Sequence, residues 1–196
     1  MAESIYGKHE EEMHEVMEYL MERIRDGSKI IGEKTGIEVI EHLKCRIKSE
    51  ESMREKCRRM GLPESEESAL HVLHDAIGLR VVCSFLDDVY AIRDFIASCE
   101  EIDIVNEKDY IRNVKPSGYR SYHMIIMVRG YYAEIQIRTI SMDTWAALEH
   151  HIRYKKNIKG NASLIFEELK ECADELASTD VRMQIIKNMI MEEENI

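Results

Sequence analysis

Four short runs rich in β-branched and other apolar residues constrain the fold most strongly, because their composition and length are typical of strands. They lie at residues 79–84, 102–105, 123–128 and 131–137. Between the first two runs, residues 87–100 carry apolar side chains at helical spacing, and a further helix is expected after the last run, at 142–155. This order predicts an α/β fold with a mixed sheet of four to five strands flanked by helices.

Helices are also expected on both sides of this central region. Residues 8–25 place apolar side chains at helical spacing opposite a row of glutamates, and Gly27 stands where such a helix would end. Two amphipathic segments, at about 163–177 and 179–193, predict a C-terminal helical pair. We therefore divide the chain into an N-terminal helical extension (1–39), a central domain (40–156) and a C-terminal helical extension (157–196).

The charge balance disfavours a protein that simply coats nucleic acid. The chain has 27 Lys+Arg and 38 Asp+Glu, a net charge of −11, so an anionic ligand must be met by a local basic cluster. The five cysteines form no CxxC pair, which predicts reduced thiols and a cytoplasmic protein. No apolar stretch approaches the roughly 18 residues of a membrane span, so we expect neither a span nor a signal peptide.

A local basic cluster occurs at residues 46–59, RIKSEESMREKCRR, which holds six basic and three acidic residues. As a helix, the segment would bring four polar side chains into one sector: Lys48, Ser52, Lys56 and Arg59. An excess of positive charge within an acidic chain favours an anion site that could hold a phosphate chain. A solvated basic helix face is the alternative for this segment taken alone.

Asp75 comes just before the first predicted strand, where a carboxylate could hold Mg²⁺ through its hard oxygen atoms. Taken alone, the residue also fits an aspartate in a turn or at a helix end. The pair His74-Asp75 would suit a metal-dependent hydrolase as well. That alternative needs a further histidine upstream and an aspartate downstream, and we find no convincing set.

Two further segments carry polar groups that packing alone would not place there. In YAEIQIRT (132–139), alternation puts Glu134, Gln136 and Arg138 on one sheet face, which is costly to bury and is therefore expected to border a ligand or metal. In KPSGYRSYH (115–123), Gly118 permits close approach of the backbone and Tyr119 offers a ring for stacking on a base. Its phosphate-compatible donors are Lys115, Arg120 and His123. A hairpin turn with an edge strand is the structural alternative.

Taken in order, these segments resemble the synthetase domain of RelA/SpoT-type alarmone synthetases, the (p)ppGpp synthetases, from about residue 40 to 156. The resemblance is carried by RIKSEES with Lys56 and Arg59, DAIGLRVVC, DDVY (87–90), DYI (109–111), KPSGYRSYH, EIQIRT and the pattern WAxxEHxxxYK from Trp145 to Lys155. Because 196 residues leave no room for a separate hydrolase or regulatory domain, the resemblance implies a stand-alone small alarmone synthetase.

Members of this family transfer the β,γ-pyrophosphate of ATP to the ribose 3′-hydroxyl of GDP or GTP and release AMP. The resemblance implies that Asp75 and Glu134 hold Mg²⁺ and that Glu134 is also the candidate base for the 3′-hydroxyl proton. It implies a donor site for ATP made of Arg46, Lys48, Ser52, Lys56, Arg59 and Arg80. It implies an acceptor site for GDP or GTP made of Lys115, Tyr119, His123, Gln136 and Asp143.

Asp143 departs from the family pattern, in which small members commonly carry asparagine. A carboxylate can accept hydrogen bonds from guanine N1–H and from its exocyclic amine, so we expect guanine selectivity to be retained or sharpened. Small relatives also imply a homo-oligomer, with a tetramer favoured. Two alternatives stay open: a toxin-type relative that modifies the 3′ end of tRNA, which the acidic flanks disfavour, and a non-catalytic nucleotide- or RNA-binding module.

Overall fold

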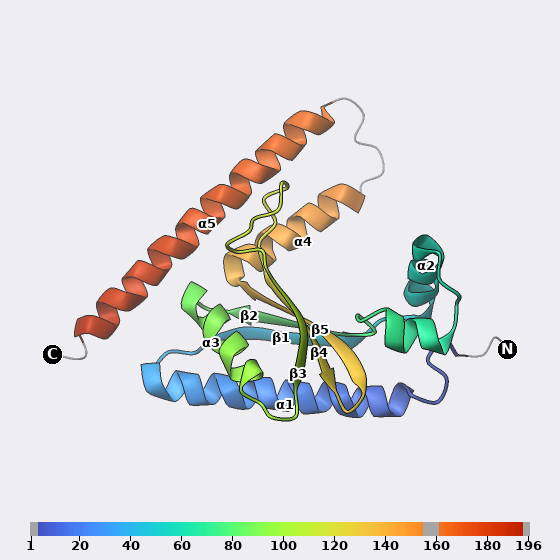
Figure 1. Cartoon of the computed structure of the whole chain (residues 1–196). Helices are drawn as coiled ribbons and strands as arrows, with labels where there is room; N and C mark the ends of the chain where they lie inside the picture. The colour runs from blue at the N-terminus through green and yellow to red at the C-terminus, as the bar shows by residue number, and fades with distance from the viewer. Residues whose placement is uncertain (1–3, 155–160, 194–196) are drawn as a thin grey trace.

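A computed structural model describes residues 4–154 and 161–193, which contain one five-stranded sheet in the order β1-β2-β5-β4-β3 (Figure 1). Its strands are β1 (Ile40–Ile47), β2 (Ile77–Cys83), β3 (Asp103–Asp109), β4 (Tyr122–Val128) and β5 (Tyr131–Thr139). β2 and β5 pair in parallel, while the other neighbours pair antiparallel. The predicted mixed sheet with flanking helices is therefore confirmed.

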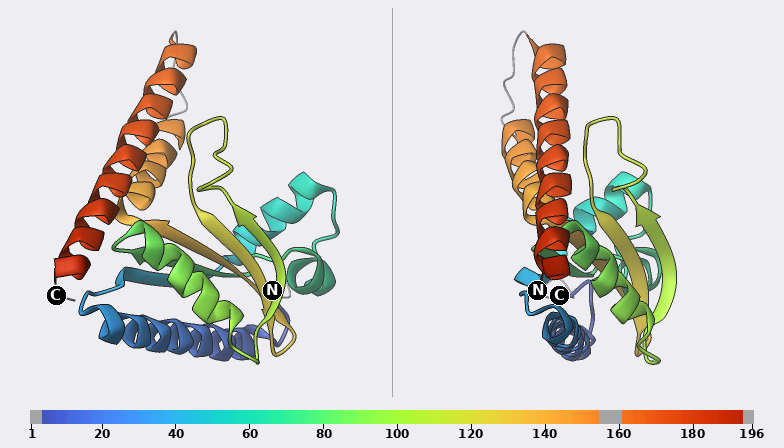
Figure 2. Two further views of the ribbon diagram at one scale, coloured as in Figure 1. Left: turned by 60° about the vertical axis from the view of Figure 1, so that its left-hand side comes forward. Right: turned by 90° about the vertical axis from the view of Figure 1, so that its left-hand side faces the viewer.

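One face of the sheet is covered by helices and forms the core. The helices are α1 (Glu10–Thr35), α2 (Glu50–Met60), α3 (Leu86–Ala97), α4 (Ile140–Tyr154) and α5 (Ala162–Glu193), with a short π-helical turn, η1 (Ser68–Val72). α1 and α3 pack on each other and against the sheet (Figure 2). Alternate residues of the two central strands, including Ile77, Leu79, Ile135 and Ile137, are fully or almost fully buried in this core.

The opposite face carries most of the polar side chains of the central strands. They form rows, because residues paired across neighbouring strands point to the same side of a sheet. One row follows the register Arg46, Gly78, Glu134 and Ile125 across β1, β2, β5 and β4. The next row consists of Lys44, Arg80, Gln136, His123 and Lys108, the last from β3. The sheet thus presents a polar face with α2 near one end and α4 near the other (Figure 1).

The N-terminal helix is longer than its glycine suggested. α1 continues through Gly27 to Thr35 and ends at Gly36, whose φ of 69° and N–H bond to Gly32 O are those of a helix C-cap. Gly27 is buried because α3 packs closely there: an added Cβ would lie 2.3 Å from Cδ1 of Phe95. The prediction that this glycine ends the helix is wrong.

Residues 40–47 form an edge strand that was not predicted from the sequence. The helix expected from residue 46 begins at Glu50, after Ser49, whose hydroxyl oxygen accepts the N–H of Ser52. Arg46 therefore lies on β1 and Lys48 in the connection to α2. The predicted helical sector containing Lys48 is wrong.

The C-terminal region is one helix rather than a pair. α5 runs over 32 residues. No glycine or proline lies near residue 178, where the break between the two predicted helices was expected, so nothing ends the helix there. It packs on α4 and, toward its C-terminal end, also contacts α3 (Figures 1 and 2). None of the helices in the described ranges has the length and apolarity needed to cross a membrane.

Candidate active site

Asp75 lies in the turn between η1 and β2, where two lysines meet its carboxylate. Nζ of Lys48 lies 2.5 Å from Oδ2 of Asp75, and Nζ of Lys56, on α2, lies 2.7 Å from the same oxygen. Burial acts to raise the pKa of Asp75, but the hydrogen bonds and charges of the two lysines outweigh it and lower the pKa. The carboxylate is therefore ionised at neutral pH.

Glu134 on β5 is the second carboxylate of the polar face. Nδ1 of His123 lies 3.5 Å from its Oε1, and Nε2 of Gln136 donates to its Oε2 at 3.1 Å. The contact with His123 lowers the pKa of Glu134 most, against the opposing effect of burial, and the amide of Gln136 lowers it further. Glu134 is thus also ionised and held in place by its two neighbours.

Two clefts adjoin Glu134. The first, of about 460 Å³, is also lined by Asp75, Lys56, Lys115 and His123. The second, of about 290 Å³, is lined by other side chains of the polar face: Lys44, Arg46, Arg80 and Gln136. The structure therefore brings the two predicted carboxylates together in one cleft, and the predicted donor arginines together in the other.

The carboxylate pair suits a hard divalent cation. Oδ1 of Asp75 is buried without a hydrogen-bond partner in the described structure, and the charge of Asp75 raises the pKa of Glu134. Within the described residues, no group of three or more His, Cys, Asp or Glu side chains could hold an ion. Mg²⁺ commonly takes one or two carboxylates and completes its octahedron with phosphate oxygens and water, so Asp75 and Glu134 fit this ion.

Three of the predicted donor residues line neither cleft: Lys48, which contacts Asp75, and the pair Ser52 and Arg59. Ser52 and Arg59 are exposed on α2, and neither lines the cleft at Asp75 or the cleft at Arg80. The hydroxyl of Ser52 instead accepts a hydrogen bond from Ser49 at 2.9 Å. Their proposed contacts with phosphates remain predictions.

On the acceptor side, Tyr119 is fixed through its hydroxyl. Its Oη lies 2.8 Å from Nε2 of His123 and accepts a hydrogen bond from Nη2 of Arg138, also at 2.8 Å. Lys115 places its Nζ 4.2 Å from the ring centre of Tyr110 and 4.8 Å from that of Tyr119. The predicted side chains Lys115, Tyr119 and His123 therefore form one cluster.

Arg138 organises this region, although it was not among the predicted site residues. It is 4% exposed and donates to Oε1 of Gln136 at 2.8 Å and to Oδ1 of Asp143 at 2.9 Å, in addition to Tyr119. Strand alternation placed Arg138 on the polar face, but it could not identify these partners. Tyr110 and Lys108 were missed as well, although both line the larger cleft.

Asp143 connects the two halves of the site. Its Oδ1 lies 2.9 Å from Arg138 on the acceptor side and 3.3 Å from Nη1 of Arg80 on the donor side. Arg120, in contrast, lines neither cleft and forms hydrogen bonds with α5. The expectation that it donates hydrogen bonds to a substrate phosphate is therefore not supported. Lys155, the last residue of the WAxxEHxxxYK pattern, lies outside the described residues.

The sequence of this chain is similar to those of known proteins. Residues 45–159 match the model of the region found in RelA/SpoT proteins. Over 159 residues the chain is 42% identical to the GTP pyrophosphokinase YwaC of Bacillus subtilis, covering 77% of this chain and 75% of that protein. It is 33% identical to the GTP pyrophosphokinase YjbM of the same organism over 163 residues, covering 78% and 74%.

Solved structures agree with the sequence comparison. The small alarmone synthetase 1 of Bacillus subtilis, bound to its product pppGpp, superposes with a TM-score of 0.77 at 26% identity, covering 91% of this chain and 94% of that one. The sequence match and the shared fold each extend over most of the chain, and the family match includes Asp75 and Glu134. The chain belongs to the RelA/SpoT family.

Proposed function

We propose that this protein is a GTP pyrophosphokinase, which transfers pyrophosphate from ATP to the 3′-hydroxyl of GDP or GTP and yields ppGpp or pppGpp together with AMP. The observation that carries the proposal is the position of Glu134 at the boundary of two clefts, with Asp75 in one of them. A carboxylate in this position can take the proton of an acceptor hydroxyl in one cleft while the phosphates of a donor in the other cleft are attacked. The relatives of this chain named above are GTP pyrophosphokinases.

In the proposed reaction, the acceptor 3′-oxygen attacks the β-phosphorus of ATP. The bond from that phosphorus to the oxygen shared with the α-phosphate breaks, and AMP leaves. Glu134, kept ionised by His123, takes the 3′-hydroxyl proton. Mg²⁺, held by Asp75 and Glu134, would neutralise the charge that develops on the phosphate oxygens.

The donor nucleotide is assigned to the cleft of Arg46 and Arg80, whose guanidinium planes suit a purine ring. Lys48 and Lys56 are assigned to its phosphates because both ammonium groups already gather at Asp75. The small alarmone synthetase 1 of Bacillus subtilis has been solved with AMPCPP, at 25% identity to this chain and a TM-score of 0.71. That relative supports an adenine nucleotide as the donor.

The acceptor is assigned to the larger cleft, with Lys115 and His123 for its phosphates and ribose. Tyr119, whose hydroxyl contacts His123 beside this cleft, is assigned to its base. Gln136 lines the cleft of Arg46 and Arg80 and Asp143 lines neither cleft, but Arg138 joins both to Tyr119, so we keep them as acceptor residues. The pppGpp found in the relative's structure supports a guanosine nucleotide as the acceptor. We keep guanine selectivity as an expectation for Asp143, which here accepts from Arg138.

The assembly and compartment form part of the same proposal. α5 exposes a set of apolar side chains: Val181, Met183, Ile185, Ile186, Met189 and Ile190. We assign this strip to contacts between copies in a homo-oligomer, with a tetramer favoured. We also propose a cytoplasmic location, with which the five free cysteines agree.

The decisive experiment incubates the purified protein with ATP, Mg²⁺ and GDP, GTP or GMP, and resolves the products by anion-exchange chromatography. We expect AMP and a guanosine 3′-diphosphate in equal amounts, both dependent on Mg²⁺ and on the guanosine nucleotide. A parallel reaction contains tRNA as the only acceptor. AMP release with tRNA alone would overturn the proposal, as would nucleotide binding without AMP from any acceptor.

A further inference from the structure

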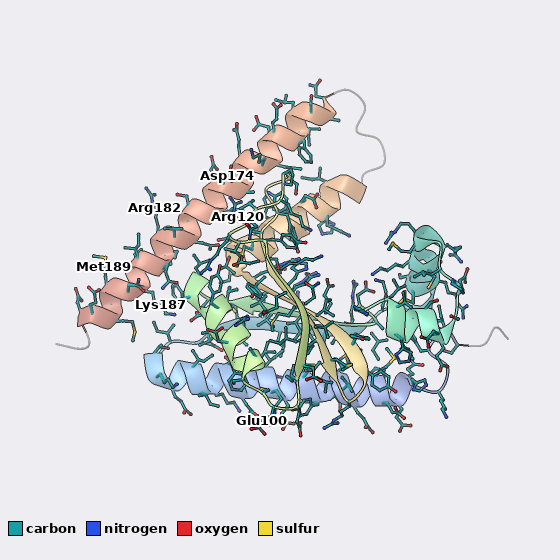
Figure 3. The ribbon with its side chains drawn as sticks, in the orientation of Figure 1. Glu100, Arg120, Asp174, Arg182, Lys187 and Met189 are labelled. Carbon is teal, nitrogen blue, oxygen red and sulfur yellow. The ribbon has the colours of Figure 1, made fainter. Side chains whose placement is uncertain are left out.

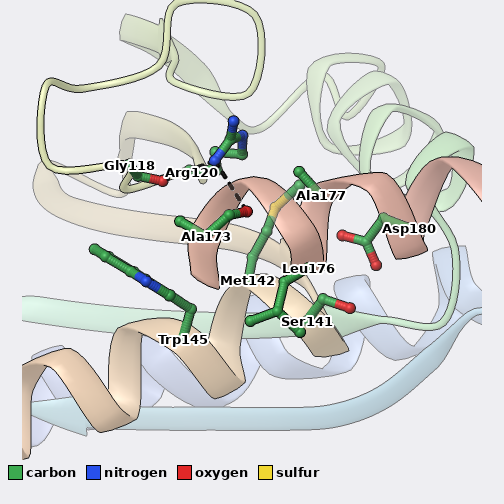
Figure 4. A pocket seen from close by; sticks show the side chains of 9 residues that line it. All are labelled: Gly118, Arg120, Ser141, Met142, Trp145, Ala173, Leu176, Ala177 and Asp180. Carbon is green, nitrogen blue, oxygen red and sulfur yellow. Dashed lines mark hydrogen bonds between the residues drawn. The ribbon is translucent and has the colours of Figure 1, made fainter. Parts of the chain in front are cut away.

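The loop that carries Tyr119 is fastened to α5 by Arg120. Nη1 of Arg120 donates to Gly118 O at 3.0 Å and to Ala173 O at 3.2 Å, while Nη2 donates to Oδ1 of Asp174 at 2.7 Å. The side chain of Arg120 is 15% exposed, so these contacts are partly shielded from water. Figure 4 shows the guanidinium above Ala173, and Figure 3 places Arg120 beside Asp174.

The two residues before Arg120 are held against the same helix. Gly118 has a φ of 87°, and an added Cβ would lie 2.7 Å from Cβ of Ala173. Tyr119 packs with Trp145 and Ala173, and Nε1 of Trp145 donates to Leu169 O of α5 at 2.7 Å. Backbone geometry, ring packing and the Arg120 guanidinium thus all fix this loop on α5.

Tyr119 links these contacts on α5 to the side chains of the site. The hydroxyl of Tyr119 lies 2.8 Å from Nε2 of His123, and Nδ1 of His123 faces Glu134. The donor cleft, in contrast, is lined by residues of β1, β2 and β5 that lie outside the loop. A displacement of the loop would therefore alter the acceptor side first.

We propose that Arg120 is a positioning residue, which holds the acceptor-binding loop on α5 and thereby sets the place of Tyr119. The proposal rests on the proposed function for the identity of the acceptor. Arg120 itself touches neither nucleotide, because its guanidinium is bound to Asp174 and two carbonyl oxygens. α5 then contributes to acceptor binding although its own side chains line neither cleft.

The kinetic test compares Asp174→Ala with Glu175→Ala, a matched control at the next, exposed position of α5. We expect Asp174→Ala to raise the KM for GDP about two- to fivefold, the upper part of the range for a partly exposed ion pair, and to leave the KM for ATP unchanged. Arg120→Ala should act in the same direction and more strongly. Asp174→Glu should restore the KM for GDP to within about twofold, and Glu175→Ala should match the unaltered protein.

A second measurement does not depend on activity. Trp145 is the only tryptophan of the chain, and it packs between Tyr119 and α5, so its fluorescence reports on the fastening. We expect acrylamide to quench this emission more in Asp174→Ala and Arg120→Ala than in the unaltered protein. Glu175→Ala and Arg182→Ala, the second a loss of an exposed arginine on the outer side of α5 (Figure 3), should not differ from it.

The outcomes separate this inference from the proposed function. If the unaltered protein forms no product, the proposed function fails, and the fluorescence alone decides whether Arg120 fastens the loop. If product forms and Asp174→Ala and Arg120→Ala leave both KM values unchanged or raise them equally, the positioning role is overturned. Unchanged acrylamide quenching in both variants would likewise overturn it.

Discussion

At the scale of single residues, Asp75 and Glu134 carry the chemistry that can be tested most directly. Asp75→Asn and Glu134→Gln each keep the size of the side chain and remove its negative charge. We expect each to lower kcat by at least about a hundredfold, because the base or the metal ligand is lost. The measurement is AMP release, with circular dichroism to confirm folding. An active, folded variant at either position would contradict the role assigned to that residue.

The lowered pKa of Asp75 predicts how stability depends on acid. A carboxyl group with a lower pKa in the folded state than in the unfolded chain stabilises the protein above the unfolded value, near pH 3.9. That contribution disappears as the pH falls through the folded-state value. We therefore expect the free energy of unfolding to fall between about pH 5 and pH 3 more steeply in the unaltered protein than in Asp75→Asn. Denaturant titrations at several pH values measure this, and identical slopes would contradict it.

The sequence named both carboxylates and several of the cationic side chains that line the two clefts, but it could not identify their partners. Residue types and strand alternation placed Glu134 and Gln136 on one face, and the structure bears this out. The central position of Arg138 depends on a turn of α4 that brings Asp143 to it, which is a contact between elements. For Arg120 the sequence suggested the wrong partner. Its positive charge suggested a contact with a phosphate, but in the folded chain it binds Asp174 on α5.

At the scale of elements, β2, β4 and β5 were predicted to within two residues at each end, because apolar and β-branched side chains recur through them. β1 was missed because His42, Lys44 and Arg46 alternate with its apolar residues at an edge of the sheet, where few side chains are buried. The end of α1 was misplaced because glycine can mark either a helix terminus or a close contact, and only the position of Phe95 distinguishes the two. Both errors have the same cause: the packing of one element on another decides these features, and the sequence pattern does not show that packing.

The close contact of α1 with α3 can be measured. In Gly27→Ala, the new methyl group would overlap the ring of Phe95, which costs more than the gain in helix propensity. We expect the free energy of unfolding to decrease by about 1 kcal/mol. The double variant Gly27→Ala with Phe95→Leu should recover part of this loss. A stabilised single variant would show that the ring moves aside freely.

α5 is anchored to α3 by a buried ionic cluster. Nζ of Lys187, 4% exposed, lies 2.8 Å from Asp87 and 2.7 Å from Asp88, and burial raises the pKa of Asp88 despite this partner. Removing one member of a buried pair leaves an uncompensated charge. We expect Lys187→Ala to lower the free energy of unfolding by about 3 kcal/mol. Arg182→Ala on the same helix should change it by less than about 0.5 kcal/mol.

At the scale of the whole molecule, the apolar strip of α5 predicts the state of assembly. We expect Ile186→Glu to reduce the molar mass measured by size exclusion with light scattering, because a charge within an apolar contact is costly. Asn188→Glu, at an exposed position of the same helix, adds the same charge and serves as the control. An unchanged mass in Ile186→Glu would place the contacts between copies elsewhere.

The boundary position of Glu134 also restricts the order of events in catalysis. Two clefts that share Glu134 as a lining residue allow donor and acceptor to be bound at the same time, so we expect direct transfer between the two nucleotides without a phosphorylated enzyme. Initial-rate plots against one substrate at fixed levels of the other should therefore give intersecting lines, the signature of a ternary complex.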